Sequence, residues 1–117
     1  MSKTIFRSLT PLLPAGTRLA EALEFFTKHM GFEIVWQHGS MAGIQRGIQL
    51  NLVENDERNW AENASFSIGV DNLDALYAEY KSIPAQVGPL EMKSWGRREF
   101  HMIVPSGVCL QFYQHES

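Results

Sequence analysis

The sequence is poor in three features that would mark particular classes of protein. Its only cysteine is Cys109, so no intramolecular disulfide can form. No stretch approaches the roughly 18 apolar residues of a membrane-spanning helix, and residues 1–16 lack the long apolar segment of a signal peptide. There are 10 basic residues against 13 acidic ones, a net charge of −3, which argues against nucleic acid as a partner. We therefore expect a cytoplasmic, unprocessed protein that binds neither nucleic acid nor a membrane.

The first half of the chain has clear hydrophobic periodicity. An apolar run over residues 5–13 predicts a strand, although Pro11 within it indicates an edge strand, a bend or a hinge. Apolar residues at spacings of three and four predict a helix over residues 18–30, capped by Thr17 and ended by Gly31. Alternating patterns then predict three strands, over residues 32–38, 41–46 and 48–54.

The second half repeats this order of elements after a polar segment, residues 55–62, that we interpret as a linker. Its expected elements are a strand at 64–70, a helix at about 72–82 capped by Asp71 or Asn72, an irregular strand at 83–93 and a hairpin across Pro105–Gly107. The repeat predicts an α+β fold with two βαβββ modules in one domain over residues 1–117, the first at about 4–54 and the second at about 63–115. Two such sheets side by side would form a curved surface whose concave side is free for a ligand.

Several motifs resemble the vicinal oxygen chelate superfamily, which includes glyoxalase I, extradiol dioxygenases and bleomycin-resistance proteins. The resemblance is carried by "TPLLP", "ALEFFTKHMGFEIVW", "VDNLDALYAEY", "GPLEMKSWGRREF" and "VPSGVCLQF", which together touch most of the chain. The segment "SWGRREF", followed by the "PSG" hairpin, is most similar to the bleomycin-resistance group. The hairpin departs from the group at Val104, Ser106 and Val108, which are positions that shape a turn.

The resemblance also locates the positions where the superfamily's enzymes bind a divalent metal. These positions usually carry His, His or Gln, and Glu, and they correspond here to Thr10, Ser65 and Gln111. Catalytic metal sites need about three ligands of suitable charge and basicity, which two hydroxyls and an amide do not supply. His101 is expected on the surface or the cleft wall, and Cys109 as a small buried hydrophobe rather than a nucleophile. We therefore expect no metal, no cofactor and no catalytic residue.

A cleft without a metal is expected to hold a small molecule by stacking and hydrogen bonding. Trp95 either lines the cleft or packs in the core, and Gly96 beside it would allow close approach of the backbone. Ser67 and Gly69 stand where the group can have aromatic residues, so a stacking platform is expected to be weaker there. Trp60 is either a replacement ring or a dimer contact. The expected ligand-binding residues are Met41, Trp60, Ser65, Ser67, Gly69, Trp95, Gly96, Gln111 and Tyr113.

The resemblance implies a non-enzymatic function. A homodimer would sequester a bleomycin-like antibiotic, or another planar or cationic one, in clefts at its interface. In the group the N-terminal arm can cross to the partner subunit, and Pro11 would then be the hinge; a local edge strand is the alternative. Two other functions stay open, namely a lyase or isomerase of the superfamily acting on an unknown small molecule, and an accessory dimer without a ligand.

Overall fold

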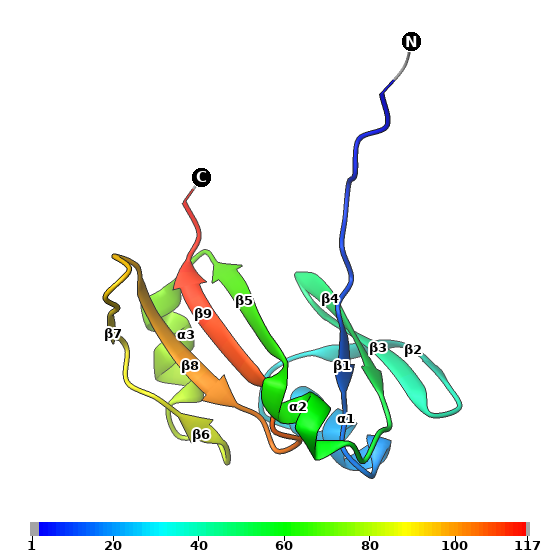
Figure 1. Ribbon diagram of the computed structural model, residues 1–117. Helices are drawn as coiled ribbons and strands as arrows, with labels where there is room; N and C mark the ends of the chain where they lie inside the picture. The colour runs from blue at the N-terminus through cyan, green and yellow to red at the C-terminus, as the bar shows by residue number, and fades with distance from the viewer. Residues whose placement is uncertain (1–2, 117) are drawn as a thin grey trace.

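The computed structural model describes residues 3–116, which form two β-sheets side by side with helices packed against them (Figure 1). The elements are β1 (Leu12–Pro14), α1 (Leu19–Lys28), β2 (Glu33–His38), β3 (Met41–Arg46), β4 (Ile48–Val53), α2 (Arg58–Asn63), β5 (Ser65–Val70), α3 (Leu73–Tyr80), β6 (Gln86–Val87), β7 (Glu91–Met92), β8 (Arg98–Ile103) and β9 (Cys109–Gln114). The predicted α+β fold with two βαβββ modules is confirmed. Over residues 3–116, no helix has the length and apolar character needed to cross a membrane.

The two sheets share one topology. The first has the strand order β1-β4-β3-β2, and the second has the order β5-β9-β8-β6. Strand β6 pairs with the end of β8, and β7 pairs with its start, at Arg98 and Glu99. In each sheet the first strand of the module runs parallel to its last strand, while the remaining pairs are antiparallel. Such a shared pattern is what a duplicated structural unit produces.

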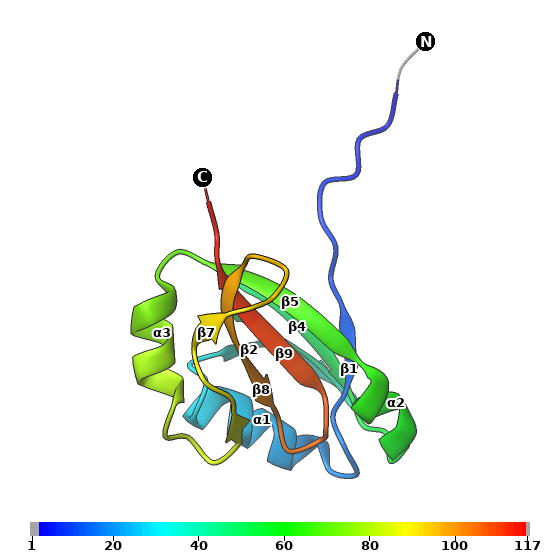
Figure 2. The same ribbon diagram turned by 60° about the vertical axis from the view of Figure 1, so that its left-hand side comes forward.

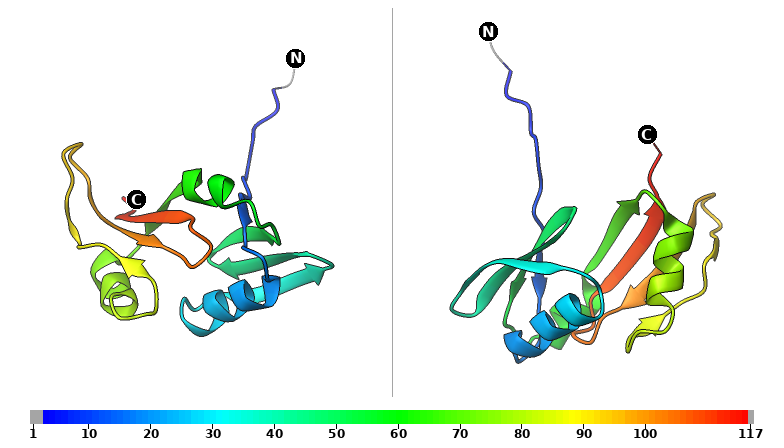
Figure 3. Two further views of the ribbon diagram at one scale, coloured as in Figure 1. Left: turned by 60° about the horizontal axis from the view of Figure 1, so that its bottom comes forward. Right: turned by 180° about the vertical axis from the view of Figure 1, so that it is seen from behind.

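One face of each sheet contributes to a single hydrophobic core with the helices. Ile44 and Leu50 are fully buried in the first sheet, as are Phe100 and Leu110 in the second. Helix α3 lies against this face of the second sheet (Figures 2 and 3). Because side chains alternate along a strand, the residues in between lie on the opposite face. We call this opposite face of each sheet its open face.

A polar clamp joins the two modules beside this core. Arg46, at the end of β3, donates from Nη1 to the carbonyl oxygen of Met30 at 2.7 Å and makes a bidentate ion pair with Glu79 on α3, with distances of 2.7 and 2.9 Å. The hydroxyl of Tyr80, also on α3, donates to the same Met30 carbonyl at 2.6 Å. The clamp fixes α3 of the second module to the end of α1 in the first.

The strand predicted over residues 5–13 is wrong for most of its length. Strand β1 covers only Leu12–Pro14, and the residues before it form an extended arm that leaves the body of the molecule (Figure 1). Ile5, Phe6 and Leu9 on this arm are 68%, 94% and 89% exposed. Apolar content predicted a strand, but strand pairing needs a neighbour for its backbone groups, and β4 pairs only with the last residues of the run.

The helix ends follow the sequence signals in part. The Asn72 side chain accepts a hydrogen bond from the Ala75 backbone N–H at 3.1 Å, as predicted. Helix α1 ends at Lys28 with His29 as its C-cap, earlier than the predicted end at residue 30, and Gly31 with φ +77° lies beyond the cap. Thr17 does not cap α1; instead the Glu54 carboxylate accepts from the Leu19 N–H at 2.9 Å. A capping group distant in sequence cannot be found from local pattern. The segment predicted as a linker, residues 55–62, contains most of α2. The boundaries of the two modules, at about 4–54 and 63–115, stay a prediction.

Candidate functional site

The open face of the second sheet brings together most of the polar residues predicted to bind a ligand. Parallel pairing of β5 with β9 matches them in register, as Ser65 with Cys109, Ser67 with Gln111 and Gly69 with Tyr113. The alternate residues of β9, Leu110 and Phe112, enter the core. The alternation of this sequence therefore places five of the nine predicted ligand-binding residues on one surface.

Hydrogen bonds connect these polar side chains. The Ser67 hydroxyl donates to the Gln111 side-chain carbonyl oxygen at 3.0 Å, which leaves the Gln111 amide group free to donate elsewhere. Burial raises the pKa of the Cys109 thiol, while hydrogen bonds with Ser65 and Gln111 act in the opposite direction. A thiol with a raised pKa stays protonated at neutral pH, so this arrangement does not activate Cys109 as a nucleophile.

The donor set on this face does not fit a divalent metal. Ser65 and Gln111 lie on neighbouring strands, but Thr10 lies on the exposed arm, ahead of the paired part of β1. Within residues 3–116, no three His, Cys, Asp or Glu side chains are grouped closely enough to hold a metal ion. A hydroxyl and an amide are weak ligands for the metals that such enzymes use. These residues are suited to hydrogen bonding with an organic molecule.

Trp95 lies on the surface, in the turn between β7 and β8. Its side chain is 64% exposed, which excludes packing in the core of a single chain. Gly96 follows with φ +85°, a conformation that favours glycine, and a β-carbon there would meet no atom within 4 Å. The glycine is therefore needed for the turn that presents Trp95, rather than for close approach of another group.

The remaining predicted residues lie away from this face. Met41 begins β3 in the first sheet, where it is half-buried and pairs with Val53 of β4. Trp60 is half-buried on α2, at the junction between the modules. Neither residue is paired in register with the β5–β9 face.

Three aromatic side chains that lie across glycines shape the open faces, and one of them, Trp36, was not predicted from the sequence to line a site. A β-carbon at Gly43 would collide with the indole of Trp36, and one at Gly88 would collide with the imidazole of His101. A β-carbon at Gly69 would lie 3.0 Å from the Tyr113 ring. The available signal was glycine within or beside a strand, which often marks close approach of another group.

Arg97 is a further residue of this face that sequence reasoning missed. Its Cζ atom lies 4.0 Å from the centroid of the Tyr113 ring, and its Nε donates to the Glu99 carboxylate at 2.9 Å. Glu99 is only 3% exposed and is the buried charged residue of the described chain. Nη2 of Arg97 lies 3.5 Å from the Ser67 hydroxyl, so the guanidinium joins the hydrogen-bonded residues to Tyr113.

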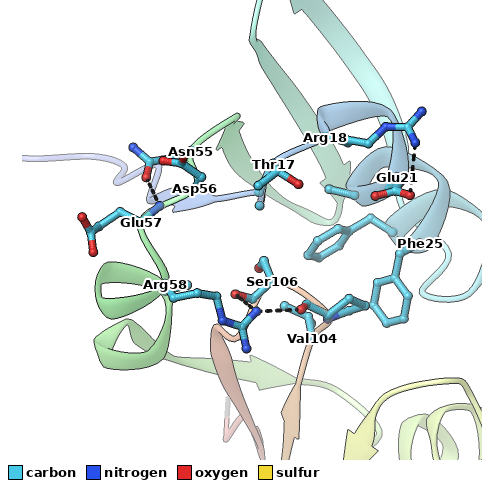
Figure 4. Close-up of a pocket in the computed structure, with 16 residues that line it drawn as sticks. Thr17, Arg18, Glu21, Phe25, Asn55, Asp56, Glu57, Arg58, Val104 and Ser106 are labelled. Atoms are coloured by element: carbon cyan, nitrogen blue, oxygen red, sulfur yellow. Dashed lines mark hydrogen bonds and ion pairs between the residues drawn. The ribbon is translucent and has the colours of Figure 1, made fainter.

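Two of the cavities in the described part of the chain are bordered by helices and lie elsewhere in the molecule. One, of about 230 Å³, is bordered by the start of α1, the segment 55–58 and the β8–β9 turn (Figure 4). Both arginines on its rim have partners within the protein: Arg18 pairs with Glu21, and Arg58 donates to the Ser106 carbonyl oxygen at 3.1 Å. The other, of about 450 Å³, lies between the β3–β4 turn and α3. Neither includes Gln111 or Trp95, which therefore lie on an open surface in the single chain.

Comparisons with known proteins agree on one family. The model of the Glyoxalase/Bleomycin resistance protein/Dioxygenase superfamily matches residues 13–112. A comparison with curated protein sequences finds no match. Among solved structures, the bleomycin-binding protein from bleomycin-producing Streptomyces verticillus, complexed with copper(II)-bleomycin, is 27% identical with a TM-score of 0.87, over 97% of this chain and 100% of that chain.

Two other solved structures share the fold. The bleomycin resistance determinant encoded on the transposon Tn5 is 24% identical with a TM-score of 0.83, over 96% of this chain and 100% of that chain. TnmS3, an antibiotic binding protein from Streptomyces sp. CB03234, is 17% identical with a TM-score of 0.73, over 97% of this chain and 100% of that chain. At these identities the likeness concerns the fold alone.

Proposed function

Because this chain belongs to the glyoxalase/bleomycin resistance protein/dioxygenase superfamily, we propose that it is a non-enzymatic protein that binds a small molecule. The ligand we propose is a bleomycin-like antibiotic, or another planar or cationic one, sequestered rather than transformed. The observation that carries this proposal is the pair Ser65 and Gln111 at positions where a metalloenzyme of this superfamily needs strong metal ligands. The likeness to a bleomycin-binding protein supports the same function.

The chemistry of the open face suits a ligand that both stacks on rings and forms hydrogen bonds. Ser67 and Gln111 offer hydrogen bonds, and Trp95 offers an exposed ring for stacking. Trp36 adds a second ring on the open face of the first sheet, held flat by Gly43. A net charge of −3 adds weak long-range attraction for a cationic ligand.

We also propose that the binding cleft forms only in a homodimer. In one chain Met41 and the β5–β9 face belong to different sheets, and the predicted residues border an open surface. The arm before β1 carries three highly exposed apolar side chains, an arrangement that a second chain would cover. Pro11 stands where the arm meets β1, which suits a hinge for exchange of the arm. The cytoplasmic location inferred from the sequence stays a prediction.

Titration with copper(II)-bleomycin and with copper-free bleomycin, followed by calorimetry, tests the proposal. We expect saturable binding by the wild type and about fivefold weaker binding by Trp95→Ala, because stacking on an aromatic side chain is worth roughly 1 kcal/mol. Met92→Ala is the matched control, since Met92 is 65% exposed but pairs with Arg98 on the other face of the sheet. If the wild type does not bind bleomycin saturably, the proposal that bleomycin is the ligand is wrong.

Metal analysis of the purified protein tests the non-enzymatic part separately. We expect no stoichiometric Mn²⁺, Fe²⁺, Ni²⁺ or Zn²⁺, and no metal-dependent change in the thermal midpoint. About one tightly bound divalent ion per subunit would instead favour a lyase or isomerase of the superfamily. The variant Gln111→Glu is informative in the same assay, because a carboxylate at this position should raise metal affinity if the surrounding geometry is retained.

A further inference from the structure

Tyr113 and Arg97 form an ordered stack on the open face of the second sheet. The Tyr113 ring lies against the backbone of Gly69, where a β-carbon would come within 3.0 Å of its Cζ and hydroxyl oxygen atoms. The guanidinium of Arg97 covers the Tyr113 ring, at 4.0 Å from the ring centroid. The stack therefore has the backbone of β5 at its base, a ring in the middle and a guanidinium plane on top.

The position of the guanidinium is determined by Glu99. Its carboxylate is 3% exposed and accepts from Arg97 Nε at 2.9 Å. A buried carboxylate needs such a partner, because removal of the compensating charge is costly. Arg97 therefore cannot leave Tyr113 without exposing or unpairing Glu99, and the plane is held in place before any ligand arrives.

The outer side of Arg97 remains available. The side chain is 40% exposed, and Nη1 makes no hydrogen bond within residues 3–116. Arginine combines a planar face that stacks on rings with N–H groups that point outward in the same plane. Glu99 balances the charge, so the gain for a ligand comes from stacking and directed hydrogen bonds rather than from net attraction.

We propose that the guanidinium of Arg97 is the ligand platform of the second module and that it selects a planar ring bearing an acceptor group, such as a carboxylate or a carbonyl. The ligand lies tilted over Arg97, so that its ring covers the exposed face of the guanidinium while its acceptor reaches the plane of the Nη1–H groups and takes a hydrogen bond from them. The inference rests on the proposed function, since it assumes that this open face is the ligand site. The guanidinium of Arg97 would take the place of the aromatic rings that related proteins can carry at the positions of Ser67 and Gly69.

A pair of matched probes tests this platform on the full-length protein. The probes are 2-naphthoate and 2-naphthylmethanol, which share a ring system and differ in the acceptor group. Dissociation constants are measured by NMR titration, with the Arg97 Nε–H resonance as the local reporter. We expect 2-naphthoate to bind about fivefold more tightly than the alcohol, because hydrogen bonds to charged groups contribute roughly 1 kcal/mol or more. The Nε–H resonance should shift with the ring current of either probe.

Two variants separate the platform from charge alone. Arg97→Lys keeps a positive charge beside Glu99 but loses the plane and its N–H groups, so the preference for 2-naphthoate should fall to about that of the alcohol. Arg18→Lys, at the exposed start of α1, is the control and should keep the wild-type preference. If Arg97→Lys does not fold, the Nε–H shift and intermolecular NOEs to Arg97 in the wild type decide the question.

The outcomes distinguish this inference from the proposed function. Equal affinity of the two probes, an unchanged preference in Arg97→Lys, or an unshifted Arg97 resonance at saturation would overturn the platform, even if copper(II)-bleomycin binds. Arg97-dependent preference without bleomycin binding would support the platform and reject the antibiotic. Failure of the wild type to bind either probe or bleomycin would reject both.

Discussion

Individual glycines determine the shape of the open faces. At Gly43, Gly69 and Gly88 the missing β-carbon leaves room for a ring from a neighbouring strand to lie flat. None of these glycines has a positive φ, so their role is space rather than backbone conformation. A ring that lies over a glycine keeps its outer π-face for another group, and for Tyr113 that group is the guanidinium of Arg97.

Substitution of Gly43 tests this arrangement. In Gly43→Ala the new methyl group collides with the Trp36 indole, so we expect the free energy of unfolding to fall by about 1–3 kcal/mol. In a Trp36→Ala background the collision is absent, and the same substitution should cost much less. Urea denaturation of the four proteins of this double-mutant cycle measures the difference. Equal costs in the two backgrounds would show that the indole does not lie over Gly43.

The raised pKa of the Tyr80 hydroxyl predicts a loss of folding stability at high pH. Burial raises the pKa of its hydroxyl from 10.0 to about 12, so the unfolded chain releases this proton first. The free energy of unfolding should therefore fall as the pH rises from 10 to about 12, by at most about 1.4 kcal/mol per pH unit. Urea denaturation across this range should show the fall in the wild type and in Tyr77→Phe. Tyr80→Phe should lack it, and a parallel fall in that variant would assign the effect to other groups.

The N-terminal arm is the element least explained by a single chain. It ends in β1, whose few paired residues bind β4, while Ile5, Phe6 and Leu9 contact little of the molecule. Exposed apolar side chains at this density are costly unless another surface covers them. A second copy of the chain is the occupant that the dimer proposal requires.

Polar substitution on the arm tests that role. We expect the double variant Phe6→Ser, Leu9→Ser to be monomeric by light scattering where the wild type is dimeric, because the buried apolar area of the exchange is lost. Arg7→Ser, on the same arm, is the control and should remain dimeric. A wild type that is monomeric at all concentrations, or a double variant that stays dimeric, would contradict arm exchange.

The two modules of the molecule share one hydrophobic core, while the N-terminal arm and the open faces of the sheets stay uncovered. Its hydrophobic core runs through both modules, and the clamp of Arg46, Glu79 and Tyr80 ties them together. The uncovered parts are the arm and the open faces. If assembly covers them, part of the stability of the fold belongs to the dimer rather than to the chain.

Thermal unfolding at several protein concentrations measures that share. For an obligate dimer the midpoint should rise as the concentration increases from about 1 to about 100 µM, because mass action favours the assembled state. The arm variant Phe6→Ser, Leu9→Ser should show a lower midpoint without this dependence. A midpoint independent of concentration in the wild type would argue that the single chain carries the full stability.

Sequence reasoning located elements and registers well where periodicity is strong. The alternation in β9 correctly placed Gln111 and Tyr113 on one face, and the signal at Asn72 marked the start of α3. It failed for the arm and for the cap of α1, because a neighbouring strand or a distant carboxylate such as Glu54 is invisible to local pattern. It left open the position of Trp95, which depends on how a turn projects from the sheet.

The sequence by itself determined the family, the repeated α+β fold and the residue types at the superfamily's metal positions. The family and the metal positions follow from the resemblance of its motifs, and the repeated fold follows from short-range patterns, neither of which depends on neighbours in space. Only the tertiary structure decided that Thr10 lies on an arm apart from Ser65 and Gln111, and that Arg97 lies over Tyr113 beside a buried Glu99. Those relations arise when strands distant in the chain pair, because the pairing register selects which side chains meet.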